Sequence, residues 1–328
     1  MSTPAYDILG IGNAIVDVVV PTPDEFLTRH GMNKGGMALI SAAEAETLYA
    51  AMPPGRESSG GSVANTCAVA AGLGARVAFL GTVADDQLGA VFRHDIAAIG
   101  VHFPSAPLVG GAPTARCLIA VTPDGQRTMN TFLGACVAFG PAELDEALIA
   151  DSAVTYLEGY LFDPPACQAA FERAVTVAHG AGRHVALSLS DAFCVNRHRA
   201  AFQALVRHGV DILFANEAEI CALYETGDFE AAAARAGHEV ALAALTRSGA
   251  GSVIFQGGTR TPIAAEPAQV VDTTGAGDAY AAGFLAAHAR GLGLASCGRL
   301  GSLAAAAAIG QYGARPDVDL RRMAAQVD

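Results

Sequence analysis

The sequence contains no tryptophan, and aromatic residues make up only 6% of its 328 residues. Its core must therefore be built mainly from Ala, Val, Leu and Ile. Charged residues are also scarce, at 16% against 52% hydrophobic residues, which argues against an intrinsically disordered chain. A chain of this length is long enough for one large α/β domain, with or without a small appendage.

Positive charge is in short supply. The chain has 20 Lys and Arg against 32 Asp and Glu, a formal net charge of −12. A general nucleic-acid binder would need a basic surface, so we expect no nucleic-acid partner. A phosphorylated ligand would have to be held by backbone N–H groups, a divalent cation and a few basic side chains.

Two further absences concern cysteine pairs and long apolar runs. The seven cysteines form no C-x-x-C pair, so we expect reduced, mostly buried thiols rather than disulfides or zinc. Met1 to Asp7 has no basic region followed by an apolar stretch, and the alanine-rich run from Gly301 to Gly310 is too short to span a bilayer. We expect a cytoplasmic protein with no membrane partner, either a monomer or a homodimer.

Strand and helix patterns alternate regularly from residue 141 onward. Helices are predicted over 141–149, 164–180 and 196–207 and from Asn216, with strands over 153–157, 184–189, 211–214, 241–246 and 251–256. This alternation predicts a parallel sheet with helices on both faces. Earlier strands at 6–11, 16–20, 37–40, 76–81, 114–121 and 128–133, and helices at 42–51, 63–72 and 85–99, are less regular. The short early strands can form a small separate sheet.

The run from Asp272 to Asp278, DTTGAGD, is the strongest chemical signal. We predict that a strand ends at 270–272 and that an apolar helix starts from Gly275, with another near Leu294. Small residues at a helix N-terminus present unpaired N–H groups at the positive end of the helix dipole, which suits a transferring phosphoryl group. Asp278 lies in the first turn, where it can accept the proton of an attacking hydroxyl.

Other interpretations of this turn are weaker. A glycine-rich helix cap would explain the glycines, but it leaves a carboxylate beside an anion site unexplained. The run is not a P-loop, because no Lys follows the second glycine. A dehydrogenase is disfavoured because Gly10 and Gly12 lack the third glycine of a dinucleotide fingerprint.

The run resembles the C-terminal signature of the ribokinase-like family of carbohydrate and nucleoside kinases. Further segments resemble other signatures of that family, in the same order along the chain: 60–65 (GGSVAN), 81–86 (GTVADD) with Gly89, and 216–219 (NEAE). The segments 10–17, 187–193 and 210–217 are similar to adenosine kinases, and 129–140 is similar to bacterial members labelled adenosine or sugar kinases.

The resemblance implies a role for each matching residue. It makes Asp278 the general base and forms the anion hole from Gly275, Ala276 and Gly277. It assigns acceptor binding to Asn13, Asp17, Gly61 and Asn65. It assigns ATP and phosphate binding to Arg127, Asn216, Thr246, Ser248, Gly249 and Gly251.

The resemblance also implies cofactors. Asn216 and Glu219 would help to place Mg²⁺ through water, although a helix start capped by Asn216 is an alternative. The resemblance also allows a monovalent cation, K⁺, held by carbonyl groups after Asp272 and near Gly313, where Asp317 replaces the small hydroxyl residue of relatives.

The implied fold is a Rossmann-like parallel α/β sandwich over residues 1–328, with a small β lid from about 13–40 and 103–134. The implied reaction is ATP-dependent phosphorylation of the 5′-hydroxyl of a nucleoside, with adenosine as first choice and a sugar such as ribose or fructose as the alternative. A nucleoside would need an apolar slot, for which the candidates are Ile15, Met37, Leu39, Phe132 and Cys136. A non-catalytic sensor would lack the base, and Asp278 is present.

Overall fold

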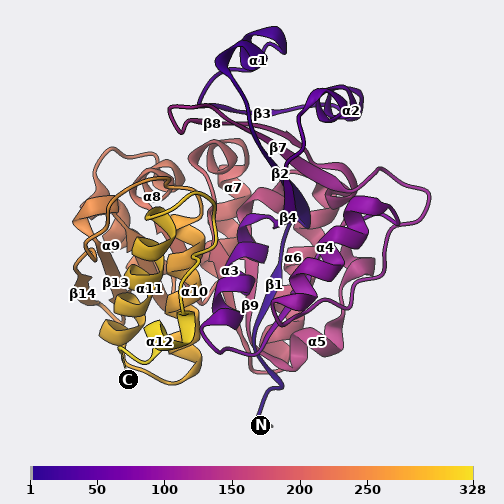
Figure 1. Cartoon of the computed structure of the whole chain (residues 1–328). Helices are drawn as coiled ribbons and strands as arrows, with labels where there is room; N and C mark the ends of the chain where they lie inside the picture. Colours follow the sequence, from indigo (N-terminus) through magenta and orange to yellow (C-terminus); the bar gives the residue numbers. More distant parts are fainter. Residues whose placement is uncertain (1–2, 328) are drawn as a thin grey trace.

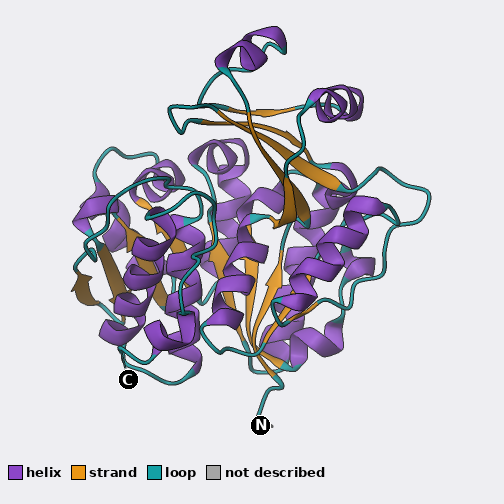
Figure 2. Cartoon of the chain, in the orientation of Figure 1, coloured by secondary structure: helices purple, strands orange, loops and turns teal. Residues whose placement is uncertain are grey.

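The apolar runs assemble into a nine-stranded sheet with helices on both faces (Figures 1 and 2). The structure is a computed structural model that describes residues 3–327, so Met1, Ser2 and Asp328 lie outside it, and the expectation for the N-terminus falls partly on them. The strand order is β14-β13-β12-β11-β10-β9-β1-β5-β6. The strands are β1 (Tyr6–Ile11), β5 (Val77–Leu80), β6 (Val101–His102), β9 (Ser152–Glu158), β10 (His184–Ser188), β11 (Ile212–Asn216), β12 (Leu242–Thr246), β13 (Ser252–Gln256) and β14 (Thr259–Ile263).

Seven neighbouring strands of this sheet, from β12 to β6, are parallel, which confirms the predicted α/β class. One edge of the sheet departs from the predicted parallel arrangement, because β13 pairs antiparallel with β12 and β14 pairs antiparallel with β13. Gly257 and Gly258 form the two-residue turn between them, and both have positive φ. A Gly-Gly pair is a recognised signal for a tight hairpin, so β14 was predictable but was missed.

Two apolar cores lie on opposite faces of the sheet. Alternation along β1 divides its side chains, with Ile8 on one face and Leu9 and Ile11 on the other. The first face is covered by α3 (Ser62–Gly72), α4 (Gln87–Ala98), α10 (Ala276–Ala289), α11 (Leu294–Ile309) and α12 (Leu320–Ala324). The second face is covered by α5 (Glu146–Ala150), α6 (Pro165–Gly180), α7 (Ala192–Gly209), α8 (Glu217–Tyr224) and α9 (Phe229–Glu239).

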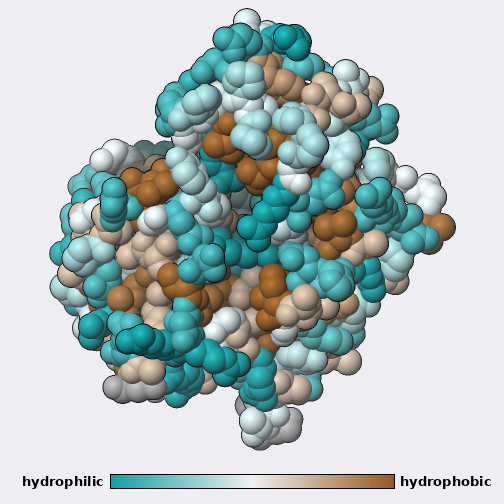
Figure 3. Space-filling model, viewed as in Figure 1, coloured by the Kyte–Doolittle hydropathy of each residue, from teal (hydrophilic) through white to brown (hydrophobic). Residues whose placement is uncertain are grey.

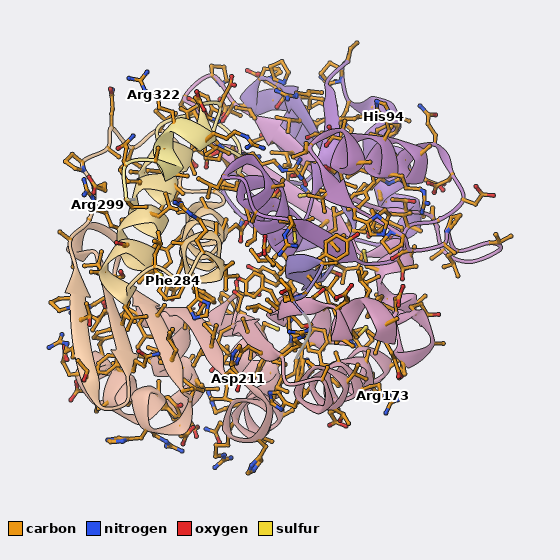
Figure 4. The ribbon with its side chains drawn as sticks, turned by 90° about the horizontal axis from the view of Figure 1, so that it is seen from below. His94, Arg173, Asp211, Phe284, Arg299 and Arg322 are labelled. Atoms are coloured by element: carbon orange, nitrogen blue, oxygen red, sulfur yellow. The ribbon has the colours of Figure 1, made fainter. Side chains whose placement is uncertain are left out.

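The view from below shows the end of the molecule farthest from the small sheet. Phe284 lies inside, where it packs against Phe214 and Tyr280, whereas Arg173 and Arg299 lie at the periphery and are about half exposed (Figure 4). Among the described residues, no helix is long and apolar enough to cross a membrane.

A second, five-stranded sheet lies over one end of the first, and we call it the small sheet (Figure 1). Its order is β3-β8-β7-β2-β4, and α1 (Asp24–Arg29) and α2 (Ala42–Ala51) accompany it. Its strands are β2 (Ile15–Pro21), β3 (Met37–Leu39), β4 (Arg56–Gly60), β7 (Ala115–Val121) and β8 (Arg127–Phe132). Strand β4 lies outside the two ranges expected for a lid.

Local signals placed most elements, and the exceptions have local causes. The helix predicted at 42–51 forms as α2, and a capping box of Ser41 and Glu44 starts it. The predicted strand at 270–272 is wrong: these residues form a loop in which Val270 is 62% exposed. The helix predicted at 141–149 is broken into a 3₁₀ turn at Pro141–Glu143 and α5. Helix α9 was not predicted; Asp228 caps its N-terminus.

Candidate functional site

A large cavity of about 1360 Å³ lies between the small sheet and the carboxyl ends of the parallel strands. In open α/β sheets, ligands bind at this edge. In Figure 3 the surface is hollowed between the upper part of the molecule and the body. Every predicted site residue lines this cavity: Asn13, Asp17, Gly61, Asn65, Arg127, Asn216, Glu219, Thr246, Ser248, Gly249, Gly251, Gly275, Ala276, Gly277 and Asp278.

The glycine-rich turn opens α10 as the sequence predicts. Gly275 is the N-cap, with φ of 75°, and a Cβ there would lie 2.6 Å from Ala314. A side chain is therefore excluded on both conformational and steric grounds. Gly277 is exposed and faces open space. The first N–H groups of α10 lack partners within the helix, so they can receive an anion from the cavity.

Asp278 lies in the first turn of α10 and is held by α3. The hydroxyl of Ser62 donates to its Oδ1 at 2.6 Å, and the amide of Asn65 also hydrogen-bonds its carboxylate. Burial raises the pKa of Asp278 to about 6, and the charge of Asp17 adds to this effect, whereas the two hydrogen bonds and Arg315 oppose it. Asp278 is thus a carboxylate that is ionised at neutral pH and basic enough to take a proton.

Asp17 faces the cavity from β2, opposite the body of the protein. Its neighbours in the register are Ser58 on β4 and Cys117 on β7. Burial raises the pKa of Asp17 to about 6, while the positive charges of Arg315 and Arg127 lower it. A carboxylate with this environment can accept hydrogen bonds from the hydroxyls of a polar ligand.

Gly61 permits the close approach of Asn13. It has φ of 100°, and a Cβ there would lie 2.2 Å from the carbonyl oxygen of Asn13. Asn65 follows one helical turn later, and its N–H donates to the carbonyl of Gly61 at 2.8 Å. The diglycine-Asn motif therefore brings two polar side chains, Asn13 and Asn65, to one wall of the cavity.

Glu158 is a cavity residue that the sequence did not reveal. It ends β9, is 1% exposed, and accepts the N–H of Asn13 at 2.5 Å. Burial raises its pKa to about 8; the hydrogen bonds from Asn13 lower it, and the charge of Asp278 raises it further. A single Glu at a strand end carries no motif, and the pairing of β9 with β1 is what brings it to Asn13.

Arg127 connects the small sheet to the glycine-rich turn that begins at Asp272. It is the first residue of β8, and its Nη1 forms an ion pair with Oδ2 of Asp272, with both side chains about 9% exposed. Burial would raise the pKa of Asp272, but hydrogen bonds from Thr274, Gly313 and Arg127 outweigh it and hold the pKa at about 2. The Nε of Arg127 is buried without a hydrogen-bond partner among the described residues.

Asn216 and Glu219 form the helix cap that was the structural alternative. The side chain of Asn216 accepts the N–H of Glu219 at 2.9 Å, and Glu219 accepts the backbone N–H of Asn216 at 2.9 Å. Burial raises the pKa of Glu219 to about 7, and the charges of Asp191 and Asp278 contribute. The two residues form the cap and also line the cavity.

No cluster of three or more His, Cys, Asp or Glu side chains suited to a metal is present among residues 3–327. Because Glu219 is committed to the cap, its carboxylate fits Mg²⁺ only through water, which suits an ion that keeps several waters. The expected K⁺ fits poorly, since the guanidinium of Arg127 already pairs with Asp272 and the Asp317 side chain is exposed.

The loop after β12 lines the far part of the cavity. A 3₁₀ turn at Ser248–Ala250 follows Thr246, and Gly251 has φ of 82°. A Cβ on Gly251 would lie 2.1 Å from the carbonyl oxygen of Ile263. The loop therefore runs close to the start of the segment 265–268, which also lines the cavity.

The cavity face of the small sheet is an apolar wall. Because side chains alternate, one face of β2, β3, β7 and β8 carries the residues that line the cavity: Ile15, Asp17, Met37, Leu39, Cys117, Ile119, Arg127, Met129 and Thr131. Figure 3 shows apolar residues where the small sheet meets the body. Of the predicted slot, Phe132 and Cys136 do not line the cavity: Phe132 lies on the opposite face of β8, and the buried Cys136 packs against the carbonyl of Ala14.

Comparison with known proteins is consistent with this geometry. The model of the pfkB family carbohydrate kinases matches residues 37–321. The crystal structure of an adenosine kinase from Sinorhizobium meliloti is 52% identical, with a TM-score of 0.90, and the match covers 98% of this chain and 99% of that one. A probable sugar kinase from Rhizobium etli is 47% identical, with a TM-score of 0.91 and 98% of both chains covered.

A third relative differs in its acceptor. An ATP-dependent ribose-1-phosphate kinase from Halopiger xanaduensis is 33% identical over 241 residues, which are 70% of this chain and 73% of the relative. Because the family model matches residues 37–321, this chain belongs to the pfkB family of carbohydrate kinases, and it is a phosphotransferase whose acceptor is a hydroxyl group of a nucleoside or sugar.

Proposed function

We propose that this protein transfers the γ-phosphoryl group of ATP to the 5′-hydroxyl of adenosine. The observation that carries the proposal is the apolar wall of the small sheet, which lies in the same cavity as Asp17. A free sugar offers hydroxyls on every side, whereas a nucleoside combines a diol with a flat apolar base. A carboxylate beside an apolar wall matches the second pattern.

The charges of the cavity support the same choice. Among its described lining residues, the basic side chains are those of Arg127 and Arg197, and each is in an ion pair with a carboxylate. A sugar 1-phosphate would need a positive group where a nucleoside carries its base. The wall offers Ile15, Ile119 and Met129 in that region instead of a free cation.

The residues of the transfer site divide the chemistry between them. Asp278 takes the proton of the acceptor hydroxyl, and the N–H groups of Gly275, Ala276 and Gly277 stabilise the charge that develops on the transferred phosphoryl group. Asp17, Asn13, Gly61 and Asn65 hold the acceptor.

The remaining predicted residues hold the nucleotide. The loop 246–251 lies along ATP, and the Nη2 group of Arg127 reaches the phosphates while Nη1 remains on Asp272. Asn216 and Glu219 orient waters of Mg²⁺, which would supply positive charge at the phosphates when bound. Met37 and Leu39 are 53% and 56% exposed, so the small sheet gains apolar contacts when it closes over an acceptor and excludes water.

A sugar kinase is the second candidate, supported by the 47% identity to a probable sugar kinase. The experiment is an ADP-release assay with adenosine, inosine, ribose, fructose and ribose 1-phosphate, with identification of the product by mass. We expect the highest kcat/KM for adenosine and the formation of AMP. A preparation of the Asp278→Asn variant is the blank for contaminating kinases. Turnover of ribose or ribose 1-phosphate without turnover of adenosine would overturn the proposal.

A further inference from the structure

Arg315 is a charged residue behind the cavity wall to which no role has been assigned. It lies in the loop between α11 and α12, and its side chain is 21% exposed. It does not line the cavity itself, although its neighbour Ala314 does. The same loop contacts the catalytic turn, since the N–H of Gly313 donates to Asp272 at 3.0 Å.

The guanidinium of Arg315 joins three elements. Its Nε donates to Oδ1 of Asn65 on α3 at 2.9 Å, and its Nη1 donates to the hydroxyl of Ser59 on β4 at 2.9 Å. Asp95 on α4 lies 3.4 Å from Nη1. The carbonyl of Arg315 accepts from the side chain of Gln311 at 2.7 Å, which fixes the loop.

These contacts determine the orientation of the Asn65 amide. Its Oδ1 accepts from Arg315, an obligate donor, so its Nδ2 faces the carboxylate of Asp278, to which it is hydrogen-bonded. Arg315 therefore donates to Asn65, and Asn65 in turn donates to Asp278. A lysine could keep the charge but could not hold both Asn65 and Ser59 in this planar arrangement.

We propose that Arg315 is a positioning residue for phosphoryl transfer: it fixes the amide of Asn65 on Asp278, and its positive charge acts on two carboxylates of the cavity, Asp17 and Asp278. The proposal rests on the proposed function in that Asp278 is the base. It does not depend on whether the acceptor is a nucleoside or a sugar.

The electrostatic surroundings make the charge of Arg315 consequential. The groups that face Asp278 come from α3, β2, β9, the turn after β9, α8 and the loop after α11: Ser62, Asn65, Asp17, Tyr156, Glu158, Tyr160, Glu219 and Arg315. Arg315 is the one cation among them. Its charge lowers the pKa of Asp278 and that of Asp17, against the burial that raises both.

The test compares the pH dependence of kcat and kcat/KM for three variants with that of the wild type, using whichever acceptor the wild type phosphorylates. Arg315→Met removes the charge and the hydrogen bonds, and Arg315→Lys keeps the charge. Arg93→Met is the matched control, because Arg93 lies on α4, the helix that carries Asp95, but contacts Phe103 and the carbonyl of Ser105 instead of Asn65 or Asp278.

For Arg315→Met we expect kcat/KM to fall by at least about tenfold. The acidic limb of its pH–rate profile should lie at a pH higher than that of the wild type by about half a unit or more. Arg315→Lys should recover the position of the limb but only part of kcat/KM, and Arg93→Met should leave the limb in place. If the acidic limb of the Arg315→Met pH profile superimposes on that of the wild type, the proposal is overturned. If Arg315→Met does not fold, an Arg315→Lys variant with wild-type kcat/KM overturns it instead.

The experiment separates the two proposals. If Asp278→Asn retains turnover, the base assignment fails whatever Arg315 does. If Asp278→Asn is inactive and the limb is independent of Arg315, the role proposed for Arg315 alone fails.

Discussion

Replacing Asp278 with Asn should slow the enzyme and stabilise the fold at the same time. The carboxylate is the proposed base, and loss of a general base costs about 10²- to 10⁴-fold in rate. The acceptor and ATP should still bind, since the anion site consists of backbone N–H groups that the substitution leaves in place.

The stability effect follows from the same burial. The pKa of Asp278 is raised from 3.8 to about 6, so the folded protein binds a proton there more tightly than the unfolded chain does. Stability is therefore lost as pH rises from about 4 through 6, and above that range the whole penalty is present. A shift of about 2 units corresponds to at most about 3 kcal/mol. Residual exposure and the altered hydrogen bond to Asn65 reduce this to about 1–3 kcal/mol.

Three measurements check this prediction. Steady-state kinetics gives kcat, calorimetric titration with a non-hydrolysable ATP analogue gives nucleotide affinity, and thermal unfolding at pH 4 and pH 7.5 gives stability. We expect a Tm higher than that of the wild type by a few degrees at pH 7.5 and little changed at pH 4. Asp163→Asn is the control for loss of a cavity carboxylate. Turnover within about tenfold of the wild type would refute the base assignment, and a lower Tm at pH 7.5 would refute the burial argument.

Three further outcomes are expected. The kcat of the wild type should fall below about pH 6, because protonation of Asp278 removes the base; a flat profile between pH 5 and 8 contradicts this. Gly12→Ala should lower the free energy of unfolding by about 3 kcal/mol, measured by thermal or urea unfolding, because the new Cβ would lie 2.0 Å from Oε2 of Glu158. Gly180→Ala is the matched control, because a Cβ there would have nothing within 4 Å, and it should be neutral or slightly stabilising. Leu39→Ser removes an apolar side chain that is already 56% exposed, so Tm should hold while KM for adenosine rises about fivefold; an unchanged KM for adenosine, or an equal rise in KM for ATP, would show that the wall does not hold the base.

The sequence by itself determined the α/β class and the motif residues that line the cavity. The glycine-rich turn and the diglycine-Asn segment are local signals, because small residues and caps specify backbone geometry within a few positions. Their conformations in the structure, with positive φ at Gly61 and Gly275, follow from the chain itself. Alternating strands and helices then predict the parallel sheet that gathers the strand ends.

Only the tertiary structure decided which isolated residues join the site. Glu158 ends a strand with no motif, and it reaches Asn13 because β9 pairs with β1. Arg315 lies 250 positions from Asn65, and no local pattern links them. The sequence also did not show which face of the small sheet each side chain occupies. Phe132 was therefore predicted to line the cavity, whereas it lies on the opposite face of β8. A shift of one residue in strand register reverses every side chain, and packing between distant strands fixes that register.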